Sequence, residues 1–365
     1  MANKTARLGD LATYINGYAF KPADWGDTGL PIIRIQDLTG NSYQLNRYDG
    51  EYPERIEVND GDVLISWSAS LGVYVWQRGK ALLNQHIFKV VFDKLPINKD
   101  YFVFAVEHKL ADMESKTHGA TMKHIVKKDF DGTTIPYPTS EKQAEIADHL
   151  RRITSIIDRQ TEQLLLLDQL VKSRFIELFG DPVLNQHGWR KVALEVNATL
   201  LNGRAYKQDE LLDSGKYPVL RVGNFFSNRG WYYSDLELDD DKYCDNGDLL
   251  YAWSASFGPQ IWNGGKVIYH YHIWKVLVGE AYNKQFLCKL LEYATESLMG
   301  DTHGIAMMHL TKSGMEKTEF IVPPIERQEQ FAAFVEQTDK SKLAVQKGLQ
   351  ELEILKKSLM QQYFG

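Results

Sequence analysis

The sequence predicts a mixed α/β fold with two pseudo-symmetric domains, separated by two long helices that pair as an antiparallel coiled coil. Three observations lead to this prediction. The same order of segments occurs twice, at an offset of 185 to 187 residues. Each copy begins with short runs rich in β-branched residues, which are typical of strands. Each copy ends in a long segment whose apolar residues recur at steps of three and four, which indicates an amphipathic helix.

Matching segments keep their order in both copies, which identifies an internal duplication. They are INGYAFK (15–21) and LNGRAYK (201–207), PIIRIQDL (31–38) and PVLRVGNF (218–225), GDVLISWSASLG (61–72) and GDLLYAWSASFG (247–258), HIFKV (86–90) and HIWKV (272–276), and THGATMKH (117–124) and THGIAMMH (302–309). Solenoids need about three or more repeats, so two copies favour two similar domains. Such a chain suits a target that has two sub-sites.

The domain boundaries follow the change of pattern along each copy. Residues 1–140 and 181–325 are expected to form the two globular domains, and residues 141–180 and 326–365 the two helices. Within the first domain, apolar runs bounded by Gly, Asn and Asp predict strands. These runs are 31–35, 62–66, 72–76, 87–92 and 133–135. Residues 100–113 predict a helix, because their apolar side chains share one face.

The first long helix has clear start, seam and stop signals. Ser140 is a suitable N-cap, and Gln143 occupies the capping-box position. A stripe of apolar residues with heptad-like spacing predicts a coiled-coil seam that only Gln160 and Arg174 interrupt. The apolar members are Ile146, Leu150, Ile153, Ile157, Leu164, Leu167, Val171 and Leu178. Such a helix is roughly 55 Å long and should stop at the Gly and Pro of residues 179–182.

The second long helix should begin after Pro324 and run to the end of the sequence. Its seam is interrupted by Lys342 and Lys356 and otherwise consists of Phe331, Val335, Val345, Leu349, Leu352 and Leu359. An isolated helix with so apolar a face needs a partner, and the duplication supplies one within the same chain. The alternative is that each helix packs separately on its own domain.

Composition limits the classes of function. The net charge is −6, from 42 basic and 48 acidic residues, and no segment is strongly basic. Contact with nucleic acid would therefore depend on local clusters or on a partner protein. No run of about 18 apolar residues and no signal-peptide apolar region is present, so a cytoplasmic protein without a membrane span is expected. Cys244 and Cys288 form neither a metal motif nor a disulfide framework.

The two helix starts carry a resemblance to a known family. In the first copy a proline-rich exit from the globule leads to an E-x-Q-x-x-I pattern, and the second copy repeats it with Phe331 in the last place. The residues are Pro138, Glu141, Gln143 and Ile146, and then Pro323, Pro324, Glu326, Gln328 and Phe331. Together with the GDVLIS-type strand, the THG-x-x-M segment and the duplication, this arrangement resembles the specificity (S) subunit of type I restriction–modification systems. Thr139 stands where the second copy has Pro324.

The resemblance implies a non-catalytic DNA-recognition subunit. Each globule would be a target recognition domain that reads one half of a bipartite, asymmetric site in double-stranded DNA, and the helices would fix the spacer. Two modification (methyltransferase) subunits, expected to dock at Glu141, Gln143, Glu326 and Gln328, would bring S-adenosylmethionine for adenine methylation. Two restriction (motor-nuclease) subunits would use ATP and Mg²⁺. The chain itself is expected to have no catalytic residue, no metal site and no bound cofactor.

Base readout needs polar and cationic side chains on loops, and several candidates occur. The most basic cluster holds Lys116, His118, Thr121, Lys123 and Lys127, and its counterpart holds Thr302, His303, His309 and Lys312. A second group lies in turn regions and comprises Tyr18, Lys21, Gln36, Arg204, Lys207 and Asn224. Arg34 and Arg221 would either bind phosphate or brace the core. Trp67, Trp253, His86 and His272 are shared between the copies and are expected to be structural, with each histidine in a strand.

Proteins of other functional classes would show different sequence features. An enzyme would need an adenine-methylase, nuclease or cofactor-binding motif, and Pro136-Tyr137-Pro138 lacks the Asn-Pro that begins the first of these. The 8 Trp and 19 Tyr suggest a tandem carbohydrate-binding protein, but such modules have no long coiled coil. A pure scaffold would not need two divergent sets of loops. A recognition subunit of a methyltransferase-only or other DNA-defence system remains an alternative.

Overall fold

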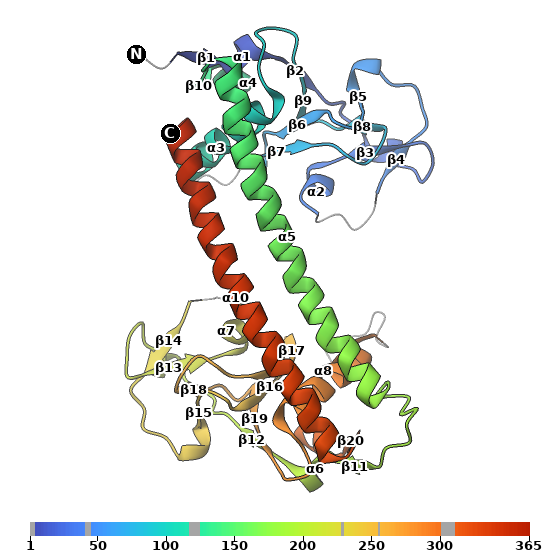
Figure 1. Ribbon diagram of the computed structural model, residues 1–365, viewed down its shortest axis with the longest axis vertical. Coiled ribbons are helices and arrows are strands. Elements are labelled where there is room, and N and C mark those ends of the chain that lie inside the picture. The colour runs from blue at the N-terminus through green and yellow to red at the C-terminus, as the bar shows by residue number, and fades with distance from the viewer. Residues whose placement is uncertain (1–3, 41–44, 117–124, 228–229, 255, 301–310) are drawn as a thin grey trace. The chain divides into compact units, whose positions relative to one another are not determined.

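The computed structural model describes residues 4–40, 45–116, 125–227, 230–254, 256–300 and 311–365. The chain divides into two compact units. Unit 1 comprises Met1–Thr161 and Lys347–Gly365, and unit 2 comprises Glu162–Gln346. Each unit therefore contains one globule, part of one long helix and part of the other. Along the chain, each globule is followed by one of the two long helices (Figure 1).

Unit 1 is built from short strands and helices. The strands are β1 (Thr5–Arg7), β2 (Thr13–Asn16), β3 (Leu30–Ile33), β4 (Arg47–Tyr48), β5 (Glu57–Val58), β6 (Val63–Ser66), β7 (Gly72–Val75), β8 (Ala81–Leu83), β9 (Ile87–Val91) and β10 (Thr134–Pro136). The helices of its globule are α1 (Leu8–Leu11), η1 (Pro22–Asp24), α2 (Ile35–Leu38), η2 (Glu54–Ile56), α3 (Lys99–Lys116) and α4 (Lys127–Gly132). One four-stranded sheet has the order β2-β9-β6-β7, a second has β4-β3-β8-β5, and β1 pairs with β10.

Unit 2 repeats this order element for element. Its strands are β11 (Lys191–Ala193), β12 (Ala198–Asn202), β13 (Tyr217–Leu220), β14 (Tyr232–Ser234), β15 (Tyr243–Cys244), β16 (Leu249–Ser254), β17 (Ser256–Ile261), β18 (Val267–Tyr269), β19 (Ile273–Val278) and β20 (Glu319–Ile321). Its helices are α6 (Leu194–Asn197), η3 (Gln208–Glu210), α7 (Val222–Phe226), η4 (Asp240–Lys242), α8 (Lys284–Gly300) and α9 (Lys312–Lys317). The sheets have the orders β12-β19-β16-β17 and β14-β13-β18-β15, with β11 paired to β20.

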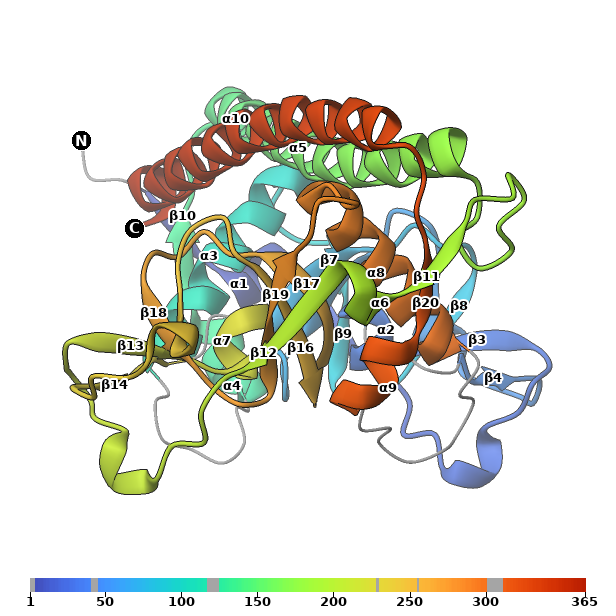
Figure 2. The same ribbon diagram turned by 90° about the horizontal axis from the view of Figure 1, so that it is seen from below.

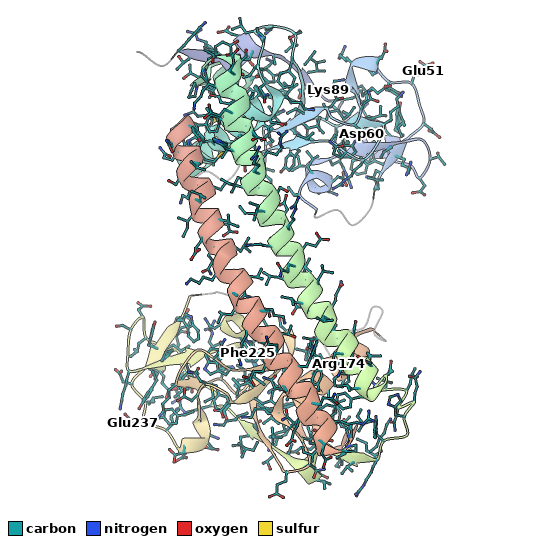
Figure 3. All side chains as sticks on the ribbon, in the orientation of Figure 1. Glu51, Asp60, Lys89, Arg174, Phe225 and Glu237 are labelled. Atoms are coloured by element: carbon teal, nitrogen blue, oxygen red, sulfur yellow. The ribbon has the colours of Figure 1, made fainter. Side chains whose placement is uncertain are left out.

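In both units the two larger sheets are joined by the same half-buried lysine. Lys89 of β9, labelled in Figure 3, donates from Nζ to the backbone oxygen of Glu57 in β5 at 2.5 Å. Its counterpart Lys275 donates to the backbone oxygen of Tyr243 at 3.2 Å. In unit 2, helix α8 packs against β17 and covers one side of the sheet that contains it (Figure 2). The duplicated sequence thus specifies a duplicated tertiary frame.

The two long helices confirm the sequence prediction almost to the residue. Helix α5 runs from Ser140 to Phe179, and α10 runs from Ile325 to Phe364. Every predicted seam residue of both helices is buried or half-buried. Arg174, labelled in Figure 3, is tolerated on the seam because its guanidinium pairs with Glu177 at 2.7 Å and lies 5.8 Å from the ring centre of Phe334. Such snorkelling keeps the charged group partly hydrated.

Contacts inside each unit show that the two helices run antiparallel. In unit 1, His149 Nδ1 lies 3.4 Å from the hydroxyl of Tyr363. In unit 2, Lys342 Nζ lies 2.5 Å from Asp168 Oδ1, and the rings of Phe175 and Phe331 are 5.4 Å apart. Residue numbers on one helix rise as those on the other fall. The alternative in which each helix packs separately on its own domain is therefore wrong.

The strand predictions for unit 1 were close where they were made, but five short strands were omitted. Strands β3, β6, β7, β9 and β10 lie within a residue or two of the predicted runs, and α3 extends the predicted helix at both ends. The short strands β1, β2, β4, β5 and β8 were not predicted. His86 and His272 directly precede β9 and β19 and do not lie within those strands, so that part of the prediction is wrong. Among the described residues, no helix combines the length and apolar character that a membrane crossing requires.

Candidate nucleic-acid interface

A shared glycine holds a two-residue turn against its neighbour strand in each unit. The amide of Gly17 donates to the backbone oxygen of Ile87 at 3.2 Å, and that of Gly203 donates to Ile273 at 3.3 Å. A Cβ atom on Gly17 would lie 2.0 Å from the backbone oxygen of Asn84. A Cβ atom on Gly203 would lie 2.3 Å from that of Tyr269. Only glycine permits this approach, which explains the shared Asn-Gly pair of both copies.

The turn itself has the same backbone bonds in both units. In unit 1 the amide of Asn84 donates to Ile33 at 3.2 Å, and that of Gln85 donates to Tyr18 at 2.9 Å. In unit 2 the amide of His270 donates to Leu220 at 2.9 Å, and that of Tyr271 donates to Arg204 at 3.1 Å. We call Asn84-Gln85 and His270-Tyr271 the tip turns. These two amide bonds are shared, whereas the residue after the turn differs in backbone conformation, because His86 has a φ of +73° and His272 does not have a positive φ. The turn side chains differ as well.

The tip turn of unit 2 borders a small polar and aromatic pocket. The pocket has a volume of about 260 Å³ and is lined by Tyr206, Leu211, Arg221, Val222, Gly223, His270 and His272. The Arg221 guanidinium also lies 4.7 Å from the ring centre of Tyr232. The structure thus brings the predicted Arg221 together with two histidines. Burial, the nearby His272 and the charge of Arg221 lower the pKa of His270 to about 4, so its ring is uncharged near neutral pH.

Aromatic packing supports the second residue of this turn. Tyr271 is 38% exposed, and its ring centre lies 4.5 Å from that of His270 and 4.0 Å from that of His272. The indole nitrogen of Trp253 donates to the backbone oxygen of Tyr271 at 2.9 Å. Trp253 also stacks on Trp274 at 5.7 Å. An exposed tyrosine is therefore carried on a rigid base that reaches the core, a favourable arrangement for specific contact.

Two predicted cations of unit 2 differ in availability. Arg204 forms a bidentate pair with Glu210 at 2.8 and 2.7 Å. That pair, with the backbone amide of Lys207, lowers the pKa of Glu210 to about 2. The guanidinium of Arg204 is thus neutralised within its own unit. The side chain of Lys207 is exposed.

The equivalent region of unit 1 carries different side chains. Tyr18 is 43% exposed and packs on Phe20 with ring centres 5.0 Å apart. Lys21 and Gln36 are exposed. Arg34 lies 3.5 Å from the carboxylate of Asp37 and 5.8 Å from the ring centre of Trp25. Arg34 thus contacts an acidic and an aromatic side chain of its own unit.

The shared tryptophans and histidines, which were expected to be structural, pack on each other. Trp67 and His86 have ring centres 5.0 Å apart, and Trp253 and His272 have them 5.1 Å apart. Trp67 also stacks on buried Phe88 at 5.6 Å. These contacts are structural. They place the tip turns immediately beside the core.

The predicted basic cluster falls mostly outside the described residues. His118, Thr121, Lys123, Thr302, His303 and His309 all lie in 117–124 or 301–310. Lys116 is the last residue of α3. The two described lysines are paired, Lys127 with Asp131 at 2.6 Å and Lys312 with Glu316 at 3.5 Å. Asn224 donates to the backbone oxygen of Gly230 at 3.3 Å.

The four residues predicted to dock a partner separate into two kinds. Gln143 and Gln328 are buried and bind backbone groups of their own units. Gln143 accepts from the amide of Asn98 at 2.9 Å and donates to Pro138 at 2.9 Å. Gln328 accepts from Asn283 at 2.8 Å and donates to Pro323 and Ala281. Both glutamines join a helix start to its globule, and burial withholds them from any partner surface. Glu141 and Glu326 are exposed, so docking stays a prediction for these two.

The sequence reasoning missed the tip turns. Asn84 and Gln85 directly precede the shared His86, and His270 and Tyr271 directly precede the shared His272. Aligning the copies two residues further upstream of HIFKV and HIWKV would have revealed this divergence. Tyr206 was also missed, although it lies within the aligned segment LNGRAYK.

Comparison with known proteins agrees with this arrangement. The family model described as type I restriction modification DNA specificity domain matches residues 2–167 and again residues 187–354. The type I restriction enzyme EcoBI specificity subunit of Escherichia coli is 29% identical over 168 residues, covering 45% of this chain and 35% of that subunit. The chain thus aligns with only about a third of that relative's length. The MjaVIII specificity subunit of Methanocaldococcus jannaschii is 23% identical, covering 98% of this chain and 91% of its own.

Solved structures share the fold over the full length. The type I restriction-modification S subunit from M. genitalium aligns with a TM-score of 0.59 at 14% identity, covering 99% of this chain and 96% of that one. A chain from a study of complex assembly and conformational transition of the type I R-M system aligns with a TM-score of 0.58 at 16% identity, covering 99% and 97%. The two matches of the family model span most of the sequence, and they show that this chain belongs to the type I restriction modification DNA specificity family and carries two copies of its domain.

Proposed function

We propose that this chain is the non-catalytic DNA-recognition subunit of a type I restriction–modification complex. It reads a bipartite, asymmetric site in double-stranded DNA, one half with each unit. The observation that carries this proposal is the pair of matching frames with different tips. The turns have the same backbone bonds, yet one carries Asn84 and Gln85 and the other carries His270 and Tyr271. Two units that bind different half-sites need this combination of shared support and divergent contact residues.

The partners are inferred from the surfaces of the long helices. Leucine and isoleucine side chains are exposed there outside the seam. They include Leu165, Leu166 and Leu170 in unit 2 and Ile156, Ile354 and Leu355 in unit 1, with exposed fractions from 43% to 69%. Contiguous exposed apolar residues mark interaction surfaces. Two methyltransferase subunits cover these faces and meet the exposed Glu141 and Glu326. They carry S-adenosylmethionine, and two motor-nuclease subunits carry ATP and Mg²⁺.

A partner protein would also explain why a DNA-binding chain carries no net positive charge. DNA affinity comes mainly from cations that neutralise phosphates. Here the net charge is −6, and Arg204, Lys127 and Lys312 are paired with carboxylates. The methyltransferase subunits therefore supply much of the phosphate contact, while this chain supplies sequence discrimination. The alternative is a complex that lacks the motor-nuclease subunits and only methylates DNA. The same tip turns would serve recognition in that complex.

Co-expression tests the proposal. The chain is produced with the methyltransferase subunit encoded beside it in a host that lacks adenine methylation, and the host genome is sequenced for methyladenine. We expect methylation at one bipartite sequence, and none when either protein is produced alone. Methylation by this chain alone, or methylation without sequence preference by the complex, would contradict the proposal.

The spacer can be tested separately by shortening both helices. Glu162–Asp168 of α5 and Lys340–Gln346 of α10 are seven-residue segments that face each other in the antiparallel register. Removing both shortens the helix pair by about 10 Å, which corresponds to about three base pairs of B-DNA. The methylated site should keep its half-sites and lose about that many spacer positions. An unchanged spacer would refute the role of the helices as a ruler.

A further inference from the structure

We propose that the tip turns read bases directly: Asn84-Gln85 contacts one half-site and His270-Tyr271 contacts the other. This inference rests on the proposed function, because it assigns the readout to particular residues of each unit. It concerns two adjacent positions in each unit that sequence comparison alone did not select. The neighbouring shared residues act as their support.

The first argument is the pattern of shared and divergent residues around the turn. The glycine beneath it, the arginine beside it, the histidine after it and the tryptophan that packs on that histidine occur in both units. They are Gly17 and Gly203, Arg34 and Arg221, His86 and His272, and Trp67 and Trp253. Both turn positions differ between the units: unit 1 has Asn84 where unit 2 has His270, and Gln85 where unit 2 has Tyr271. Residues that support a contact can be common to two specificities, whereas residues that read bases cannot.

The second argument is chemical. The side-chain amide of Gln85 offers a donor and an acceptor, which match the N6 and N7 atoms of adenine in the major groove. Asn84 adds an amide donor, while its Oδ1 accepts from the backbone amide of Gln85 at 2.9 Å. In unit 2 the His270 imidazole is uncharged, because burial and neighbouring positive groups lower its pKa. Its Nδ1 accepts from the backbone amide of His272 at 3.4 Å, which leaves Nε2–H as a donor, and Tyr271 adds a hydroxyl and an apolar ring. Both turns therefore have hydrogen-bonding groups for base edges rather than fixed cations for phosphates.

The third argument is placement. Gln85 and Tyr271 are exposed, whereas Asn84 and His270 are half-buried against the frame. Arg221 lines the same pocket as His270, so a phosphate contact and a base contact can be made from one place. The competing candidate Arg204 is held by both oxygens of Glu210. Among the described residues of unit 2, His270 and Tyr271 thus combine exposure, support and divergence.

An exchange of turns between the units tests the inference. In the full chain, His270→Asn is combined with Tyr271→Gln. Unit 1 carries these two residues on a turn with the same two amide bonds but with a φ of +73° at His86, so the melting temperature of the variant establishes that it folds. The chain, in complex with its methyltransferase subunit, selects from a library of double-stranded oligonucleotides with random bases. Selected sequences are compared with those of the wild-type complex.

We expect the base preferences to change in one half-site only, by roughly 5- to 150-fold at each affected position. The reciprocal variant, Asn84→His with Gln85→Tyr, should change only the other half-site. Asn263→Ala is a matched control, because Asn263 is an exposed turn residue between β17 and β18 of the same unit. It should leave both half-sites unchanged. Melting temperatures of all variants establish that they are folded.

The outcomes are distinct. Folded variants that keep the wild-type preferences at both half-sites would overturn the inference, while a bipartite wild-type sequence would still uphold the proposed function. Folded variants that lose affinity equally for every sequence would also overturn it, because that result indicates phosphate contact. If the wild-type complex selects no bipartite sequence, the proposed function itself fails.

Discussion

The two units differ most in their cores at the place where the long helices meet the globule. In unit 2, four phenylalanine rings pack together there: Phe175, Phe179, Phe286 and Phe331. Their ring centres are 4.6 to 5.8 Å apart. The equivalent positions of unit 1, at an offset of 185, hold Met360, Phe364, Tyr101 and Ile146. The same frame is therefore filled by two different sets of side chains.

This difference separates the features that both units share from those that vary between them. Apolar volume at the helix junction can be redistributed, because cores tolerate changes that conserve volume and pattern. The buried glutamine of each helix start is retained, because its bonds satisfy backbone groups that would otherwise be buried without partners. The tip turns vary in side chain but not in backbone bonds. The helix junction, the buried glutamines and the tip turns should therefore respond differently to mutation.

The largest effect is expected at the phenylalanine cluster. Phe331→Ala removes a fully buried ring that contacts Phe175 and Phe179, and should lower the free energy of unfolding by about 3–5 kcal/mol. Phe331→Ile, which installs the residue of unit 1, should cost less because it leaves a smaller cavity. Urea-induced unfolding of the full chain measures both. Leu165→Ala, at an exposed position of α5, is the control and should stay within about 0.5 kcal/mol of wild type. A loss below about 1 kcal/mol for Phe331→Ala would show that this cluster does not hold the helices to unit 2.

A smaller loss is expected at the buried glutamines. Gln328→Ala leaves the amide of Asn283 and two backbone oxygens without this partner, and should cost about 1–3 kcal/mol. Gln143→Ala removes two bonds instead of three and should cost less. The same unfolding measurement applies, with exposed Gln330→Ala as the control. Equal stability of the wild type and Gln328→Ala would disprove the anchoring role.

The smallest effect concerns the ion pair that only unit 2 has at this position. Unit 1 has Tyr18 in place of Arg204 and Asp24 in place of Glu210. Arg204 lowers the pKa of Glu210 from 4.5 to about 2, so the pair stabilises the fold above pH 4.5. This contribution is lost as the pH falls from 4.5 toward 2. The melting temperature of Glu210→Gln should therefore fall less than that of the wild type across this window. Parallel curves would indicate that the pair contributes nothing, as many exposed pairs do.

Much of the fold could be predicted, because its signals are local and periodic. The long helices were bounded to within a residue or two by Ser140, Gly180 and the apolar stripe. The strand β8 was missed because Ala81–Leu83 is only three residues long and lacks alternation. The order of strands within each sheet depends on pairing between distant segments, and no local pattern specifies it.

The candidate site was predicted less completely. Arg34, Arg221, Tyr18 and Arg204 do lie around the tip turns, since each copy aligns there clearly. The neutralisation of Arg204 depends on Glu210, which approaches through the turn of η3, and this pairing has no sequence signature. Gln143 and Gln328 were assigned to partner docking because the resemblance implied that methyltransferase subunits dock at the helix starts. Burial of the side chain against the preceding loop was visible only in three dimensions.

The central claim is that each unit reads one half-site independently. Exchanging residues 1–140 for the corresponding domain of another family member of known target, followed by methylome sequencing of a host that also produces the methyltransferase subunit, tests it most directly. The account predicts that one half-site changes to that of the donor, while the other half-site and the spacer stay the same. A change in both half-sites, or in neither, would contradict it.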